Sequence, residues 1–126
     1  MAKQNRKSLE PALGQLNSAS EVLATLRWAI DRTLVDEDLD AFVAITLAMM
    51  PAARAALQSV DQSPVKSHVR AAMDALSHIE WLVAPHLPDA GFDRVIAIAD
   101  SSIARCQVAI DAAKALIRKN ARHVSS

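Results

Sequence analysis

The sequence has few of the residues that build turns, strands and aromatic platforms. Its 126 residues include no tyrosine, two glycines and two phenylalanines, whereas 52% of the chain is hydrophobic. This balance favours packed helices over strands or disorder. Two isolated glycines also exclude a glycine-rich phosphate loop. We therefore predict an all-α protein with a single core, because the chain has the size of one domain.

Cysteine is nearly absent as well. Cys106 stands alone, which excludes an intramolecular disulfide and a cysteine-based zinc site. It lies on an apolar stripe of the last predicted helix, which favours a small buried hydrophobic side chain. No serine, histidine and acid trio is recognisable, and no activating histidine accompanies the cysteine in sequence. We predict a non-enzymatic protein with no cofactor and no bound metal.

Long hydrophobic runs and an export signal are also lacking. The longest uncharged stretch, 41–53, is shorter than the roughly 20 residues that cross a bilayer, and it is interpreted as part of a buried helix. The first nine residues are polar and basic and lead into no apolar region of the kind that secretory signals contain. We expect a cytoplasmic protein without a membrane span.

The formal net charge is zero, yet the charges are segregated along the chain. Acids are densest over 36–40, whereas both ends are basic, so the body between the ends carries net negative charge. Clustered cations can neutralise phosphates, but cations near a helix C-terminus also complement its dipole. Nucleic-acid binding is therefore an alternative function, and it would use Lys3, Arg6, Lys7, Arg118, Lys119 and Arg122.

The sequence divides into a predicted arm, a bundle and a tail. Residues 1–17 contain Pro11 and Gly14 among polar residues, and we expect a short, partly disordered arm. Ser18 and Glu21 have the spacing of a capping box, which predicts a helix from there to about residue 34. The predicted bundle covers 18–120, and residues 121–126 form a flexible tail.

Acidic residues at 36–38 suit the positive end of a second helix, which continues to Val60. Its apolar residues cover much of its girth, so the helix is either central or covered by a partner. Pro51 removes one backbone hydrogen bond inside it, which leaves a bend or a break as alternatives.

The last two helices have the clearest patterns. Ser63 and Pro64 suit the N-cap and first position of a third helix, which stops before Pro85. The fourth helix repeats isoleucine every seven residues from Ile96 to Ile117, with small residues three positions further on. Short connections then predict four antiparallel helices in one bundle.

Histidine chemistry has weak support. Asp74 and His78 form an i, i+4 pair, but two ligands do not make a metal site. His68 could accept a phosphoryl group in a phosphotransfer-like bundle, yet no glycine follows one turn later to make room for a partner. A phosphotransfer or metal-binding bundle is therefore a further alternative.

The leading hypothesis is a protein-interaction or regulatory module that binds a second copy of itself or another protein. Trp81 points away from the predicted core, which suits an interface, although the N-terminal arm could instead cover it. The placement of Trp28 stays open. The apolar surplus of the second helix and the heptad face of the fourth are the candidate surfaces, and the predicted interface residues are Phe42, Met49, Trp81, Ile103 and Ile110.

Overall fold

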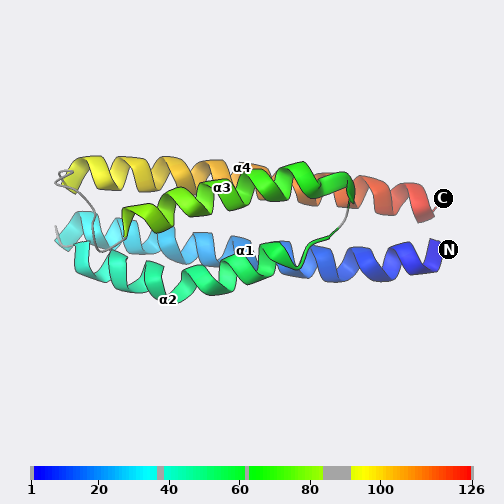
Figure 1. The fold of residues 1–126 in the computed structure, drawn as a ribbon, viewed down its shortest axis with the longest axis horizontal. Helices are drawn as coiled ribbons and strands as arrows, with labels where there is room; N and C mark the ends of the chain where they lie inside the picture. The colour runs from blue at the N-terminus through cyan, green and yellow to red at the C-terminus, as the bar shows by residue number, and fades with distance from the viewer. Residues whose placement is uncertain (1, 37–38, 62, 84–91, 126) are drawn as a thin grey trace.

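The computed structural model describes residues 2–36, 39–61, 63–83 and 92–125, and none of them lies in a strand. They form four α-helices and one 3-10 turn: α1 (Ala2–Asp36), α2 (Leu39–Gln58), η1 (Ser63–Val65), α3 (Lys66–Leu82) and α4 (Phe92–Ser125). Consecutive helices run antiparallel, and α1 also packs against α4, so the helices close into one bundle (Figure 1). The predicted all-α antiparallel bundle is confirmed.

The helices differ in length, which gives the bundle two unlike ends. α1 and α4 have 35 and 34 residues, whereas α2 and α3 have 20 and 17. At 1.5 Å per residue, the long helices measure about 50 Å and α2 measures about 30 Å. The first part of α1 and the last part of α4 therefore extend beyond the turn between α2 and α3 (Figure 1). Both termini lie at this extended end.

The seven-residue repeat of α4 lines the core of the bundle and is not free to form the predicted interface. Its isoleucines, from Ile96 to Ile117, are all buried, and the small residues Ala99, Cys106 and Ala113 between them are fully buried. Small side chains at these positions let the neighbouring helices approach α4 closely. Fully burying one isoleucine contributes about 1.5–3 kcal/mol, so the four isoleucines together contribute about 6–12 kcal/mol.

The segment predicted as an arm is helical. Residues 2–17 form the first part of α1, so the helix start expected at Ser18 is wrong. The Ser18 hydroxyl instead donates to the Gly14 carbonyl at 3.0 Å, one turn back. The reason is packing, because buried Ala12, Leu16 and Ala19 carry the apolar stripe across this point. Burial of a continuous stripe outweighs a local capping signal. At the other terminus, α4 continues to Ser125, so residues 121–125 of the predicted tail are helical.

Pro51 bends α2 without breaking it. The helix continues from Leu39 to Gln58 through the proline and follows a bowed course (Figure 1). Pro51 and Leu47 are both exposed, so the Leu47 carbonyl, which loses its backbone donor, lies on the solvent side of the helix. Water can satisfy such a carbonyl, and helices usually curve with their convex side towards solvent.

Candidate interaction surfaces

Three of the five predicted interface residues belong to the core of one chain. Phe42, Ile103 and Ile110 are fully buried, and Met49 is half-buried and packs against the same core. A fully buried side chain cannot contact a partner while the bundle stays folded. The assignment of these three residues to an interface is therefore corrected, because the faces that seemed surplus in α2 and α4 pack against the neighbouring helices.

Trp81 is the predicted interface residue that does lie on the surface. Its side chain is 50% exposed near the C-terminal end of α3. The alternative that the N-terminal segment folds back over it is wrong, because that segment is part of α1 and lies at the opposite end of the bundle (Figure 1). Trp28 on α1 is also exposed, with the Arg32 guanidinium 5.9 Å from its ring centroid.

The outer face of α2 is apolar, and none of its residues was among the predicted interface residues. Between Asp40 and Gln58, every exposed residue is apolar: Ala41, Ala44, Leu47, Ala48, Pro51, Ala52 and Ala55. We call these seven residues the α2 outer face. Alanine is less hydrophobic than leucine or isoleucine, so the large residues on the buried side of α2 dominate its hydrophobic pattern. The row of alanines on the outer face is therefore easy to overlook in the sequence. The absence of any charged residue from Ala41 to Ala53 is the signal that could have found it.

A salt bridge turns the one charged residue of this stretch away from the outer face. Arg54 is the only charged residue in 41–57, and its guanidinium contacts the Glu80 carboxylate on α3. It also donates a hydrogen bond to Ser77 Oγ at 3.1 Å. Arg54 is thus held against α3, and the α2 outer face carries no charge along its length.

Composition alone would allow α2 to cross a membrane. The segment from Asp40 to Gln58 reaches a mean hydropathy of 1.4, but 33% of it is buried inside the bundle. A core helix of a soluble protein passes the same test, so the observation is weak evidence for a span.

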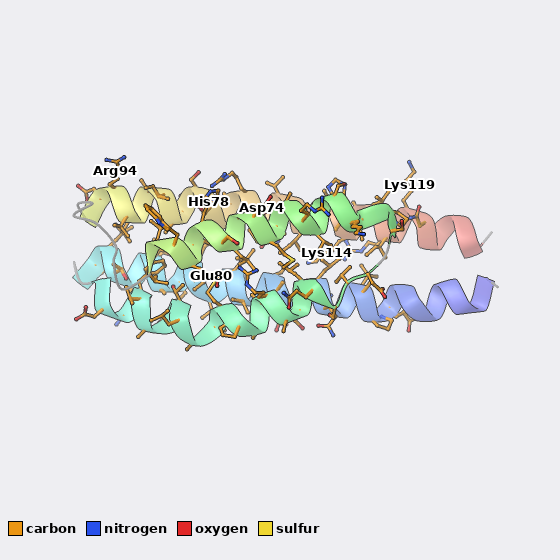
Figure 2. The ribbon with its side chains drawn as sticks, in the orientation of Figure 1. Asp74, His78, Glu80, Arg94, Lys114 and Lys119 are labelled. Carbon is orange, nitrogen blue, oxygen red and sulfur yellow. The ribbon has the colours of Figure 1, made fainter. Side chains whose placement is uncertain are left out.

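The structure brings the two basic ends of the chain to one end of the bundle. Lys3, Arg6 and Lys7 lie in the first turns of α1, and Arg122 lies in the last turns of α4. Arg118 and Lys119 are exposed on α4. Figure 2 shows Lys119 towards this end and Arg94 at the opposite end. The helical segments that carry the two clusters, although far apart in sequence, therefore lie at the same end of the bundle.

The candidate chemical residues do not assemble into a site within the described part of the chain. Asp74 and His78 are both exposed, and His78 Nδ1 lies 3.4 Å from the Arg105 guanidinium (Figure 2). His68 is half-buried on α3. Among the described residues, no group of three or more histidine, cysteine, aspartate or glutamate side chains is placed to hold a metal ion.

Cys106 is a buried small side chain, as predicted. Its Sγ donates to the Ala72 carbonyl at 3.4 Å across the α3–α4 contact. Burial raises the pKa of the Cys106 thiol from 9.0 to about 12, because a thiolate would lose its hydration there. A thiol that stays protonated is a poor nucleophile, so this cysteine serves packing.

Comparison of the chain with protein-family models, with curated proteins and with solved structures found no match. The fold and surfaces define a four-helix bundle in which the outer face of α2 is uncharged and both basic segments of the sequence lie at one end.

Proposed function

We propose that this protein is a non-enzymatic interaction module that forms a homodimer through the α2 outer face. The observation that carries the proposal is the uncharged stripe of seven exposed apolar residues on α2. Monomeric proteins rarely leave a continuous apolar face of this length in water, and such faces usually mark binding sites.

The composition of the face favours a second helix of the same kind. Ala41, Ala44, Ala48, Pro51 and Ala55 recur at steps of three and four, which is the spacing of a helix-packing seam. Small residues along a seam let two helices approach closely, and Leu47 supplies an exposed large side chain beside it. A two-fold dimer presents the same face twice, so one self-complementary helix is sufficient.

The test is the solution mass of the full-length protein, measured by light scattering coupled to size exclusion at low and high salt. A dimer whose mass does not change with salt is expected, because apolar contacts are not screened by ions. The variant Ala48→Glu places a charge at the centre of the seam and should give a monomer. Ala24→Glu, on the exposed side of α1, is the matched control and should remain dimeric.

Two results would contradict this proposal. A strict monomer at both salt concentrations removes the homodimer. Co-flotation of the protein with lipid vesicles, lost in Ala48→Glu but kept in Ala24→Glu, would instead assign the α2 outer face to a membrane surface. Circular dichroism of each variant checks that the helix content is unchanged.

A second candidate function rests on the basic end. Because both basic clusters lie at one end of the bundle, they can act together on an anionic polymer such as a nucleic acid. Binding should then weaken steeply with salt, and Arg118→Glu with Lys119→Glu should weaken it at low salt. An affinity for duplex DNA that these substitutions leave unchanged would remove this candidate.

A further inference from the structure

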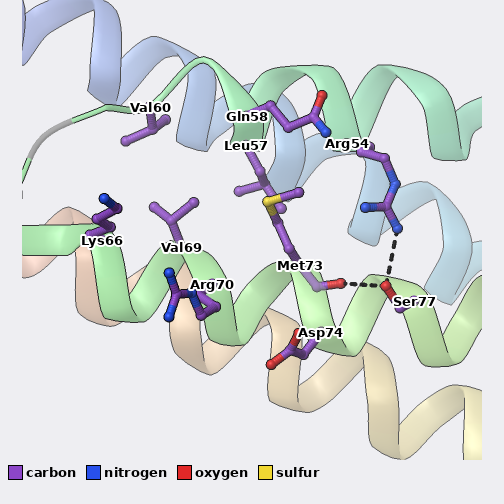
Figure 3. Close-up of a pocket in the computed structure, with 10 residues that line it drawn as sticks. All are labelled: Arg54, Leu57, Gln58, Val60, Lys66, Val69, Arg70, Met73, Asp74 and Ser77. Atoms are coloured by element: carbon purple, nitrogen blue, oxygen red, sulfur yellow. Dashed lines mark hydrogen bonds between the residues drawn. The ribbon is translucent and has the colours of Figure 1, made fainter.

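A cleft of about 430 Å³ opens between the C-terminal half of α2 and the N-terminal half of α3 (Figure 3). It forms where the chain turns from one helix to the other, and α2 packs against α3 less extensively than α1 packs against α2 or α3 against α4. Its volume lies within the range of small-molecule sites in proteins. The cleft is separate from the α2 outer face, so it concerns an activity beyond dimerisation.

The floor of the cleft is apolar. Leu57 and Val60 of the α2 side and Val69 of α3 line it and are buried. Figure 3 shows Met73 extending from α3 towards Leu57 across the cleft. Met73 is half-buried against the core, and its flexible thioether can adapt to a bound apolar group.

The rim of the cleft is cationic. Lys66 and Arg70 line it from successive turns of α3 and are exposed, and neither has an ion-pair partner among the described residues. Arg54 lines it from α2 but is already paired with Glu80. Asp74 is the one carboxylate of the lining, and Figure 3 shows it pointing away from α2. An anion at the rim would therefore meet two unpaired cations.

We propose that this cleft binds a small aliphatic carboxylate. The carboxylate would lie between Lys66 and Arg70, which supply charge-assisted hydrogen bonds. The chain would cover the apolar floor and contact Met73. A cationic rim over an apolar floor fits an amphiphilic anion better than a free inorganic anion or a neutral hydrocarbon, since each of these satisfies only one part of the lining.

The methyl group of Met73 gives a direct readout of occupancy. Octanoate is titrated into protein labelled with ¹³C in the methionine methyl groups, and Met73→Leu identifies the Met73 signal. We expect this signal to shift and saturate, whereas the buried Met50 signal, which does not come from a cleft residue, stays in place. Acetate lacks the apolar chain and octylammonium has the opposite charge, so neither should produce the saturating shift.

Charge reversal at the rim is the second arm of the experiment. Lys66→Glu with Arg70→Glu should weaken octanoate binding about tenfold or more. The matched pair Arg27→Glu with Arg94→Glu, exposed cations outside the cleft, should leave the affinity unchanged. Ala48→Glu should also bind octanoate normally, because the proposal does not depend on the dimer.

Three outcomes would overturn the proposal. These are the absence of a saturating Met73 shift, an equal response to octylammonium, and octanoate binding that survives reversal of both rim charges. Each variant is first checked for unchanged helix content. A monomeric mass alone would contradict only the proposed homodimer.

Discussion

The Arg54 guanidinium on α2 contacts the Glu80 carboxylate on α3, and the same Nη2 donates to Ser77 Oγ at 3.1 Å. The side chains of the ion pair are 31% and 40% exposed, so solvent screens the attraction. A half-exposed pair contributes at most about 1 kcal/mol. A double-mutant cycle of Arg54→Ala and Glu80→Ala, followed by urea unfolding, should give a coupling energy below this value that decreases with salt. A coupling of several kcal/mol would show that the pair is much less hydrated than its exposure indicates.

Thr46 and Thr33 are buried, and their Oγ1 atoms have no hydrogen-bond partner among the described residues. An unsatisfied buried hydroxyl costs roughly 1–3 kcal/mol, and valine has nearly the same shape without this group. Thr46→Val should therefore raise the free energy of unfolding by about 1 kcal/mol. Thr25→Val is the control, because the Thr25 hydroxyl donates to the Glu21 carbonyl at 3.1 Å and its loss should not stabilise. Equal effects of the two substitutions in thermal unfolding would contradict this explanation.

Gly14 tests whether the N-terminal segment is a working part of α1. It lies inside the helix, and a Cβ added there would meet no atom within 4 Å. Alanine at an exposed helix position is favoured over glycine by about 1 kcal/mol, so Gly14→Ala should raise the free energy of unfolding by this amount. Ala24→Gly, at an exposed position further along α1, should lower it similarly. No effect of Gly14→Ala beside a clear effect of Ala24→Gly would mean that the segment unfolds separately.

The sequence predicted the regular parts of the bundle well. In α4, the seven-residue spacing of isoleucines identified a buried stripe. Ser63 and Pro64 marked the turn before the third helix, but they lie in η1, and α3 begins at Lys66 with Val65 as its N-cap, so the N-cap predicted at Ser63 is wrong by two residues. These features are local, because the periodicity and the turn residues act within one helix or one turn. The start of α1 was not predictable in this way, since the stripe through Leu16 becomes favourable only when other helices cover it.

The interface residues could not be predicted reliably, because their burial also depends on how the helices are arranged in space. Hydrophobic periodicity shows that a face is buried but not whether its cover comes from the same chain or from a second one. Phe42, Ile103 and Ile110 were therefore indistinguishable from interface residues until the helices were placed. Trp81 could be placed on the surface because a single face of α3 buries all the large aliphatic residues of that helix, and Trp81 does not lie on this face. Cytoplasmic location and self-association stay predictions.

The buried Cys106 thiol makes the free energy of unfolding depend on pH in the alkaline range. Its pKa is raised to about 12 by burial, so above pH 9 the unfolded chain loses this proton while the folded chain keeps it. Stability then falls as pH rises, by about 1.4 kcal/mol per unit for this group. The advantage of the wild-type chain over Cys106→Ala should accordingly shrink between pH 9 and 11 in urea unfolding. A difference that stays constant with pH would contradict the raised pKa.

The orientation of the proposed dimer follows from the distribution of charge along the bundle. A parallel pairing of α2 with its copy would place the first turns of the two helices, each carrying the exposed Asp40, beside one another. Like charges brought together at an interface are unfavourable, so we expect the antiparallel pairing. Ala41, Ala48 and Ala55 lie seven residues apart on one side of α2, about 10 Å per step. Single cysteines at these positions can therefore report the orientation.

In an antiparallel dimer, Ala48→Cys should form a disulfide with its own copy, because position 48 lies near the two-fold axis. Ala41→Cys mixed with Ala55→Cys should cross-link to each other, and neither should cross-link alone. A parallel dimer would reverse the last two results. The native Cys106 does not interfere, since it is buried and stays protonated. Non-reducing gel electrophoresis after mild oxidation reads all four samples, and the wild-type chain, which should remain uncross-linked, is the control.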